Sequence, residues 1–424
     1  MVKNIYLTLF VISLVLSSVY VFEPGLPQPA DFLLAFLIMI LATGYIVRPP
    51  VHKDLYLAAG LFLGYVTVIS LFWRTQYETA HFLLTPLYYT FNFATLVLVV
   101  SFLKEFRERF VAICQAALAS AIVLEIVALF LLPATDYRAL GTFNNPNQLG
   151  YWALLAGASV LVLRRDQKLS MLDLAVLCGA GYLTLASLSK AAMLSFALLL
   201  LLALVCQGLT RPIKVALLGL VLGGMALAVA EPSLVDQLLS KGVTGKVADR
   251  FESLGQQADD SLRGRGYDRI WRYPEHLVFG AGEGATWRFG GPINPRQGQR
   301  EMHSTLGTVL FSYGVIGFSF FLVFLAMVFR RAPLAHMLYS LPIWAYGMTH
   351  QGLRDTMLWI FFGLVFGVAH YARSARPQPM VAAPAAHAPL TARRPVAAPP
   401  GRPAIDPVLV GARQPREGVR WQPR

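Results

Sequence analysis

The chain has 424 residues, of which 56% are hydrophobic and 14% are charged, and its formal net charge is +13. Charged residues make up about a quarter of soluble domains, so this composition excludes a soluble multidomain protein and indicates a polytopic membrane protein. The sequence contains no phosphate-loop motif, no glycine-rich dinucleotide motif, no His-Glu-x-x-His and no metal-ligand spacing of Cys and His. A nucleotide-driven pump and a zinc protease are therefore excluded, and we expect neither a metal nor another cofactor.

A membrane-spanning helix needs about 20 mostly apolar residues. On this criterion the sequence predicts an all-α protein with about twelve transmembrane helices, at 4–22, 30–48, 54–73, 84–103, 109–132, 148–163, 171–188, 191–209, 213–230, 304–329, 333–351 and 355–372. Residues 1–230 hold nine of them and residues 304–372 hold three. Between them lies one large loop, 231–303, in which we expect short surface helices. The Ala- and Pro-rich tail, 373–424, is expected to be disordered.

Basic residues predict the orientation, because cytoplasmic loops retain Lys and Arg. The short connections between predicted spans fall into two alternating sets. One set, together with Lys3, carries thirteen Lys and Arg residues, and the other carries only Arg74, Arg138, Lys190 and Arg354. Both termini are therefore expected in the cytoplasm and the large loop outside. The loop is neutral, with ten basic and ten acidic residues, whereas the tail has nine arginines and two acids. The net positive charge thus comes from the predicted cytoplasmic connections and the tail. We therefore expect membrane lipids as partners and no nucleic acid.

The large loop contains the densest group of chemically capable side chains. Arg265, Arg269 and Arg272 recur at i, i+4 and i+7, which places three guanidiniums on one face of a helix that starts near Gly264. Neighbouring acids or lipid phosphates explain such a face; so does a diphosphate site, because Arg binds phosphate oxygens bidentately. The glycine-rich half, 278–298, is expected to be irregular loop whose backbone amides approach a ligand.

His303 follows this loop at the edge of the next span. An interfacial role would explain it, but a neutral imidazole there could also take a proton from a sugar hydroxyl. Arg138 precedes a turn with Asn145 and Asn147, and Lys190 lies in a tight external connection. Helix capping would explain the asparagines and snorkelling would explain Lys190. Binding of an external anion is the alternative explanation. Glu125, inside a predicted span, should face a cavity or a partner.

Together these segments resemble the O-antigen ligase and polymerase family of bacterial envelope glycosyltransferases. The resemblance covers residues 140–317 and includes Gly141-Thr142-Phe143-x-Asn145-Pro146-Asn147-x-x-Gly150, Ser187-x-Ser189-Lys190, an R…W…P…GxGxG pattern (Arg265 or Arg269, Trp271, Pro274, Gly280, Gly282, Gly284), His303, and Tyr313-Gly314-Val315-Ile316-Gly317. The chain departs from the family at Lys190, where Arg is common; lysine keeps the charge and loses the bidentate fork.

The resemblance implies a GT-C-like, metal-independent enzyme of the bacterial inner membrane whose active site faces the periplasm. Its donor would be an undecaprenyl-diphosphate-linked glycan and its acceptor lipid A-core, in an inverting displacement. His303 would act on the acceptor hydroxyl, and Arg265 with Lys190, and with Arg269 or Arg138, would bind the diphosphate. Asn145 and Asn147 would shape the site. Arg265 is favoured over Arg269 as the principal arginine.

Other functions are compatible with the same pattern. An O-antigen polymerase and a protein O-oligosaccharyltransferase belong to the same family; a ligase is favoured because one large external loop dominates and His303 follows it directly. A secondary transporter or flippase is the alternative from another class, since twelve spans are common there. Transporters, however, place ionisable residues near the bilayer midplane, where this chain has only Glu125 as a clear acid.

Overall fold

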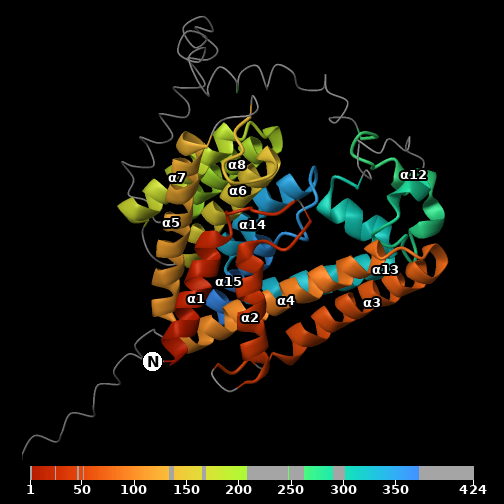
Figure 1. The fold of residues 1–424 in the computed structure, drawn as a ribbon, viewed down its shortest axis with the longest axis horizontal. Coiled ribbons are helices and arrows are strands. Elements are labelled where there is room, and N and C mark those ends of the chain that lie inside the picture. Colours follow the sequence, from red (N-terminus) through yellow and green to blue (C-terminus); the bar gives the residue numbers. More distant parts are fainter. Residues whose placement is uncertain are drawn as a thin grey trace, which may run out of the picture. The chain divides into compact units, whose positions relative to one another are not determined.

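In a computed structural model, residues 2–23, 25–44, 47–50, 52–132, 138–164, 169–207, 247, 262–289 and 301–371 are described. These belong to one compact unit; the predicted tail, the predicted span 213–230 and most of the first half of the large loop lie outside the described residues. All regular elements within the described ranges are helices, which confirms the all-α class there (Figure 1). They are α1 (Val2–Leu16), α2 (Pro29–Ala42), α3 (Lys53–Tyr77), α4 (His81–Phe106), α5 (Glu108–Leu131), α6 (Pro146–Leu163), α7 (Met171–Ala186), α8 (Lys190–Cys206), α12 (Arg269–Arg272), η2 (Pro274–His276), η3 (Thr286–Phe289), α13 (Thr305–Phe329), α14 (Leu334–Gly347) and α15 (Thr356–Tyr371).

Each predicted span other than 213–230 overlaps one of these helices. Four of them, α3, α4, α5 and α13, are long and apolar enough to cross a membrane, and α1, α2, α7, α8 and α15 are shorter apolar helices. The described part of the chain is therefore compatible with a membrane protein. The number of twelve spans and the GT-C-like arrangement stay predictions.

The core forms around α6, α15 and the second half of α4. Residues 149–163 of α6 and 357–369 of α15 are buried on every side, as expected for helices that are hydrophobic all round. α15 packs against α4 and α6, and Gly363 permits close approach because a Cβ there would lie 2.8 Å from Cβ of Val99. α3 packs against both α4 and α13, and the three run side by side (Figure 1).

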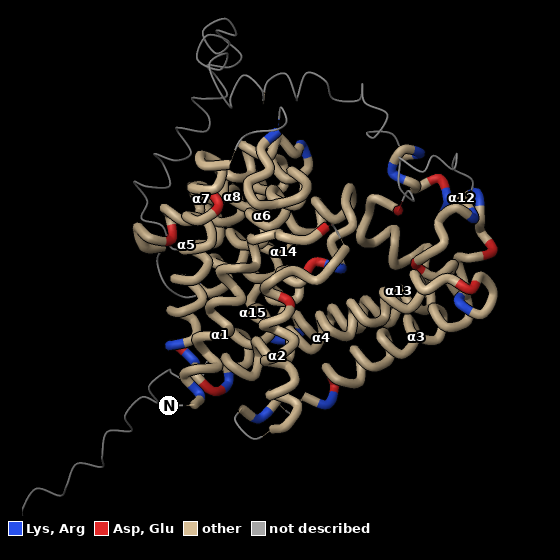
Figure 2. The backbone as a smooth tube through the Cα atoms, in the orientation of Figure 1, with Lys and Arg blue, Asp and Glu red and all other residues tan. Residues whose placement is uncertain are grey.

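Among the described residues, the polar contacts between connections join connections of the same predicted side of the membrane. Charged residues lie mostly at the helix ends (Figure 2). The predicted external set includes Arg138 Nε to Ser187 O (3.0 Å), Asn144 Nδ2 to Phe22 O (2.7 Å) and Thr356 Oγ1 to Asp31 Oδ1 (3.1 Å). The predicted cytoplasmic set includes Lys3 to Glu105 (2.5 Å), Arg109 to Asn4 (3.1 Å) and Arg330 to Asp54 (2.7 Å). The alternation predicted from the basic residues is consistent with this segregation.

The glycine-rich segment after η2 docks backbone to backbone onto a break in α13. The break is at Gly314, whose φ is 64°. There the Ala281 N–H donates to Phe311 O (2.9 Å), the Gly282 N–H donates to Ser312 O (2.8 Å), and the Val315 N–H donates to Leu277 O (2.7 Å). The amides of residues 281 and 282, which the sequence led us to expect near a ligand, are thus used to bind α13.

Replacing Gly314 by Ala should detach this segment. The new Cβ would lie 2.2 Å from the Val278 carbonyl oxygen, and φ at this position is positive, so backbone must move on both sides. We expect a loss of about 3 kcal/mol or more in the free energy of unfolding, measured by thermal unfolding in detergent. Gly64→Ala is the matched control: nothing lies within 4 Å of its Cβ, and a helical Gly→Ala change stabilises by up to about 1 kcal/mol. Equal melting temperatures for the two variants would contradict the docking role.

Candidate functional site

The turn before α6 is anchored on Glu125, a fully buried carboxylate of α5. Glu125 Oε2 accepts from the Thr142 N–H (3.2 Å) and Oε1 accepts from the Thr142 hydroxyl (2.6 Å). Gly141, with φ 59°, leaves the space for this carboxylate, because a Cβ there would lie 2.4 Å from Glu125 Oε2. Gly141 and Thr142 of the motif therefore bind Glu125, which gives this acid of a predicted span its partner.

The same turn holds Arg138 in a fixed position. Its Nε donates to Ser187 O (3.0 Å) and its Nη2 donates to Asn147 Oδ1 (2.7 Å). Asn145 caps α6 by accepting from the Asn147 N–H (2.8 Å), and the hydroxyl of Tyr346 in α14 donates to Asn147 O (2.9 Å). The two asparagines thus orient Arg138 and join the turn to α14.

Arg265 reaches the connection between α14 and α15. Its Nη1 donates to Thr349 O (2.6 Å), and the Tyr267 hydroxyl donates to Met348 O. The Arg265 carbonyl accepts from the His303 N–H (3.0 Å), so Arg265 and His303 lie on adjoining stretches of backbone. Two predicted site residues, one from the middle and one from the end of the predicted large loop, are thereby brought together.

The three arginines of the large loop do not share one helical face, contrary to the prediction. Residues 262–268 form turns with Gly266 at φ 77°, and α12 contains only Arg269–Arg272. The guanidinium of Arg269 lies over the ring of Phe289 (5.7 Å), and that of Arg272 pairs with Asp268 (3.1 Å). The spacing was correct for a helix, but the positive φ at Gly266 interrupts it.

His350 lies beside His303, although the sequence analysis did not select it as a site residue. Its ring stacks on Tyr346 (4.6 Å between centroids, 15° between planes) and meets the ring of His303 edge-on (6.5 Å). The Thr305 hydroxyl donates to His350 O (3.0 Å), which ties the start of α13 to the 348–355 connection. The one signal in the sequence was its place at the predicted external end of a span.

The pKa of His350 reflects its burial and its basic neighbours. Burial, and after it the neighbouring basic groups of Arg265, His303 and Arg138, lower its pKa to about 3. His350 is therefore neutral at pH 7. The cluster formed by Arg138, Arg265, His303 and His350 is hereafter the basic cluster.

The other two predicted site residues lie outside the contacts described for the basic cluster. Lys190 begins α8, three residues after Ser187, whose carbonyl binds Arg138. It is thus adjacent through the 187–189 turn. Arg269 is directed toward Phe289, on the side of the glycine-rich segment.

A buried ion pair fastens the glycine-rich segment to the basic cluster. Arg354 binds Glu283 (2.6 Å) and Glu301 (3.0 Å), and Glu283 also accepts from the hydroxyls of Tyr89 (2.8 Å) and Tyr313 (3.1 Å). Burial alone would lower the pKa of Arg354, but the two carboxylates raise it well above its ordinary value. Glu301 lies two residues before His303, so this pair fixes the distance between the 301–303 and 348–355 stretches.

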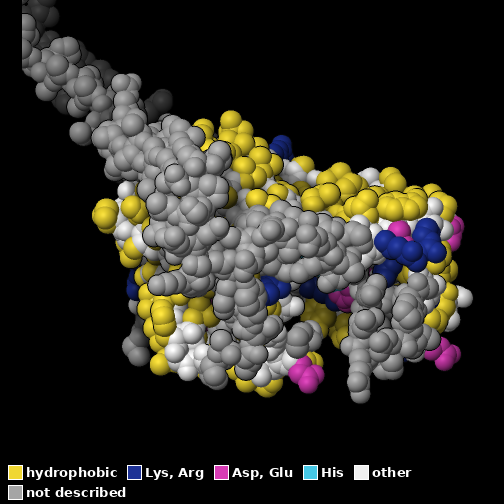
Figure 3. All heavy atoms as spheres, turned by 90° about the horizontal axis from the view of Figure 1, so that it is seen from above, with side chains coloured by type: hydrophobic (Ala, Val, Ile, Leu, Met, Phe, Trp, Pro, Cys, Tyr) yellow, Lys and Arg dark blue, Asp and Glu magenta, His cyan; other side chains and the backbone are white. Residues whose placement is uncertain are grey.

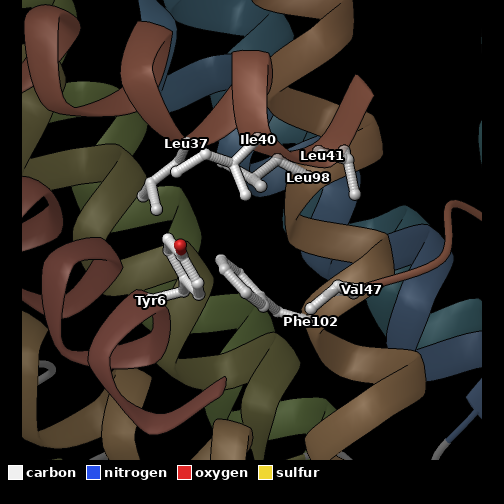
Figure 4. Close-up of a pocket in the computed structure, with 7 residues that line it drawn as sticks. All are labelled: Tyr6, Leu37, Ile40, Leu41, Val47, Leu98 and Phe102. Carbon is white, nitrogen blue, oxygen red and sulfur yellow. The ribbon is translucent and has the colours of Figure 1, made fainter. Parts of the chain in front are cut away.

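Seen from above, basic and acidic side chains are visible among the hydrophobic ones (Figure 3). An apolar pocket lies elsewhere, between α1, α2 and α4, where the rings of Tyr6 and Phe102 face aliphatic side chains (Figure 4). It is lined by Tyr6, Leu37, Ile40, Leu41, Val47, Leu98 and Phe102. Having no titratable group besides the Tyr6 hydroxyl, this pocket offers no chemistry comparable to the basic cluster.

Comparison with known proteins adds no assignment. No family model matches the chain, and no curated protein matches it.

The neutral state of His350 predicts a pH dependence of stability. Its pKa is about 3 when folded and its ordinary value is 6.5, so below pH 6.5 the unfolded chain binds the proton more readily and stability falls by about 1.4 kcal/mol per pH unit. Asp355, whose pKa burial raises to about 6, acts in the opposite direction between pH 6 and 4. Comparing wild type with His350→Gln isolates the first effect: between pH 7 and 5 the variant should lose less stability. Parallel curves would contradict a neutral His350.

Proposed function

We propose that this chain is an O-antigen ligase, a GT-C-like enzyme that transfers O-antigen from undecaprenyl diphosphate to the outer-core sugar of lipid A-core. The observation that carries the proposal is the basic cluster, in which Arg138, Arg265, His303 and His350 meet from segments far apart in the sequence. The proposed setting is the bacterial inner membrane, with both termini cytoplasmic and the cluster facing the periplasm.

The arginines of the cluster suit a diphosphate leaving group. Arg138 is held by Ser187 and Asn147, and Arg265 is held by Thr349. Donors that are fixed before the reaction stabilise developing charge without reorganising, and guanidiniums do so without changing protonation. Lys190 adds a further cation from the neighbouring turn. The diphosphate then leaves with the electron pair of the broken bond, stabilised by these charges and by no bound metal.

His303 is the proposed base. It is exposed, and its backbone is joined to that of Arg265 (3.0 Å), so a sugar at this place would lie between imidazole and guanidinium. The acceptor hydroxyl oxygen attacks the anomeric carbon, the bond from that carbon to the diphosphate oxygen breaks, and the hydroxyl proton passes to His303. A single displacement of this kind inverts the configuration.

Substitutions within the cluster should abolish transfer while the protein remains folded. For purified protein given a labelled polyprenyl-diphosphate glycan and lipid A-core, we expect His303→Ala and Arg265→Ala each to lower the rate by about a hundredfold or more. Arg272→Ala is the matched control, an arginine of the same loop that pairs with Asp268 and is 50% exposed. It should retain nearly full activity. Full activity of both cluster variants would overturn the scheme.

A deletion strain distinguishes ligation from polymerisation. Without a ligase, polymerised glycan should accumulate on the lipid carrier and lipopolysaccharide should end at the core, seen as loss of the ladder on a gel. Core bearing a single repeat unit would instead identify a polymerase.

A further inference from the structure

We propose, independently of the activity proposed above, that residues 277–282 form a re-entrant segment, which enters the bilayer along α3 and α13 and exposes Val278 and Phe279 to lipid acyl chains. The sequence led us to expect this stretch in an external loop. Its contacts instead place it against the middle of two helices that are long and apolar enough to cross a membrane.

The contacts with α3 set the depth of the segment. The Tyr65 hydroxyl donates to Phe279 O (3.0 Å), and Trp73 Nε1 donates to Gly280 O (2.9 Å). Tyr65 stands twelve residues from either end of α3, inside the uncharged stretch 55–73. The midpoint of a spanning helix lies near the midplane of the bilayer whatever its tilt, and the hydrocarbon is about 30 Å thick. The Phe279 carbonyl, one side chain away from Tyr65, therefore lies at the depth of the hydrocarbon.

α13 gives the same depth from a second set of contacts. The Val315 N–H donates to Leu277 O (2.7 Å), directly after the break at Gly314. Gly314 is nine residues from the start of α13, a distance of about 14 Å along the helix, and residues 304–329 carry no charge. α3 and α13 pack side by side (Figure 1), so the two helices place the segment consistently.

The backbone of the segment is suited to a place without water. Irregular backbone is tolerated at membrane depth only where its polar groups are bonded within the protein. Here the Gly280 N–H donates to His276 O (2.8 Å), the Gly282 N–H donates to Ser312 O (2.8 Å), and α3 supplies side-chain donors to two carbonyls. A hydroxyl and an indole N–H thus serve groups that water would serve in an external loop.

The outward surface of the segment is apolar, which favours acyl chains over a water-filled cavity. Val278 is 52% exposed and Phe279 is 64% exposed. They adjoin the exposed side chains of Val315 on α13 and of Val68 and Phe72 on α3. The segment therefore continues the apolar surface that these two helices present outward, and the partner that fits this surface is the hydrocarbon of the bilayer.

Spin-label accessibility in lipid vesicles tests the proposal. The full chain, with its three cysteines replaced by alanine, would carry a nitroxide at Phe279→Cys, at Val68→Cys on α3, or at Arg272→Cys, whose native side chain pairs with Asp268 and is 50% exposed. Oxygen concentrates in hydrocarbon and a nickel chelate stays in water. We expect oxygen collisions to exceed nickel collisions several-fold at 279 and 68, and the reverse at 272. Phe279 is mostly exposed, so its loss leaves the packing intact; Val278→Cys probes the same turn if Phe279→Cys does not fold.

Three results would overturn the proposal. Nickel collisions at 279 as frequent as those at 272 would place the turn in water. Few collisions with either reagent at 279 would mean that a second protein surface covers it. Predominant nickel collisions at 68 would remove α3 from the bilayer and the segment with it. Glycan transfer by the wild type is measured separately, so failure of the ligase assignment leaves these outcomes unchanged.

Discussion

The candidate site depends on the docking of one backbone segment onto another at the break in α13. A helix that is interrupted inside a buried region leaves amide and carbonyl groups whose desolvation is costly. Here the segment 277–282 supplies them, and only glycine fits at Gly280 and Gly314, where a Cβ would lie 2.3 and 2.2 Å from backbone oxygens. Close approach of two backbones is thus what holds part of the large loop against the helices.

That docking places Glu283 where Arg354 can bind it. A carboxylate buried without partners would be strongly destabilising, and Glu283 is satisfied by Arg354 and by two tyrosine hydroxyls. Because Arg354 also binds Glu301, the ion pair sets the positions of the stretches that carry His303 and His350. The glycine-rich segment therefore acts on the basic cluster through Arg354, while the amides of residues 281 and 282 bind α13.

The sequence predicted most of the helices, because long apolar runs and basic flanks are local signals, and it grouped Arg138, Asn147, Arg265 and His303 by sidedness. It could not predict which residues these side chains contact. Gly266 ended the expected arginine helix, since a positive φ is invisible in a spacing rule. His350 was missed because its importance comes from Arg138 and Arg265, which reach it from remote segments. The glycine spacing indicated an irregular loop but not the carbonyls of α13 that it binds.

The hydrogen bonds of the arginines show how one fold uses the same side chain for two purposes. Arg354, Arg272 and Arg330 bind carboxylates, which cancel their charge and hold elements together. Arg138 and Arg265 also donate to neutral oxygens, those of Ser187, Asn147 and Thr349, and these bonds orient their guanidiniums. Guanidiniums that are held in place from two remote segments are what the proposed diphosphate donor requires, because donors fixed before the reaction do not have to reorganise.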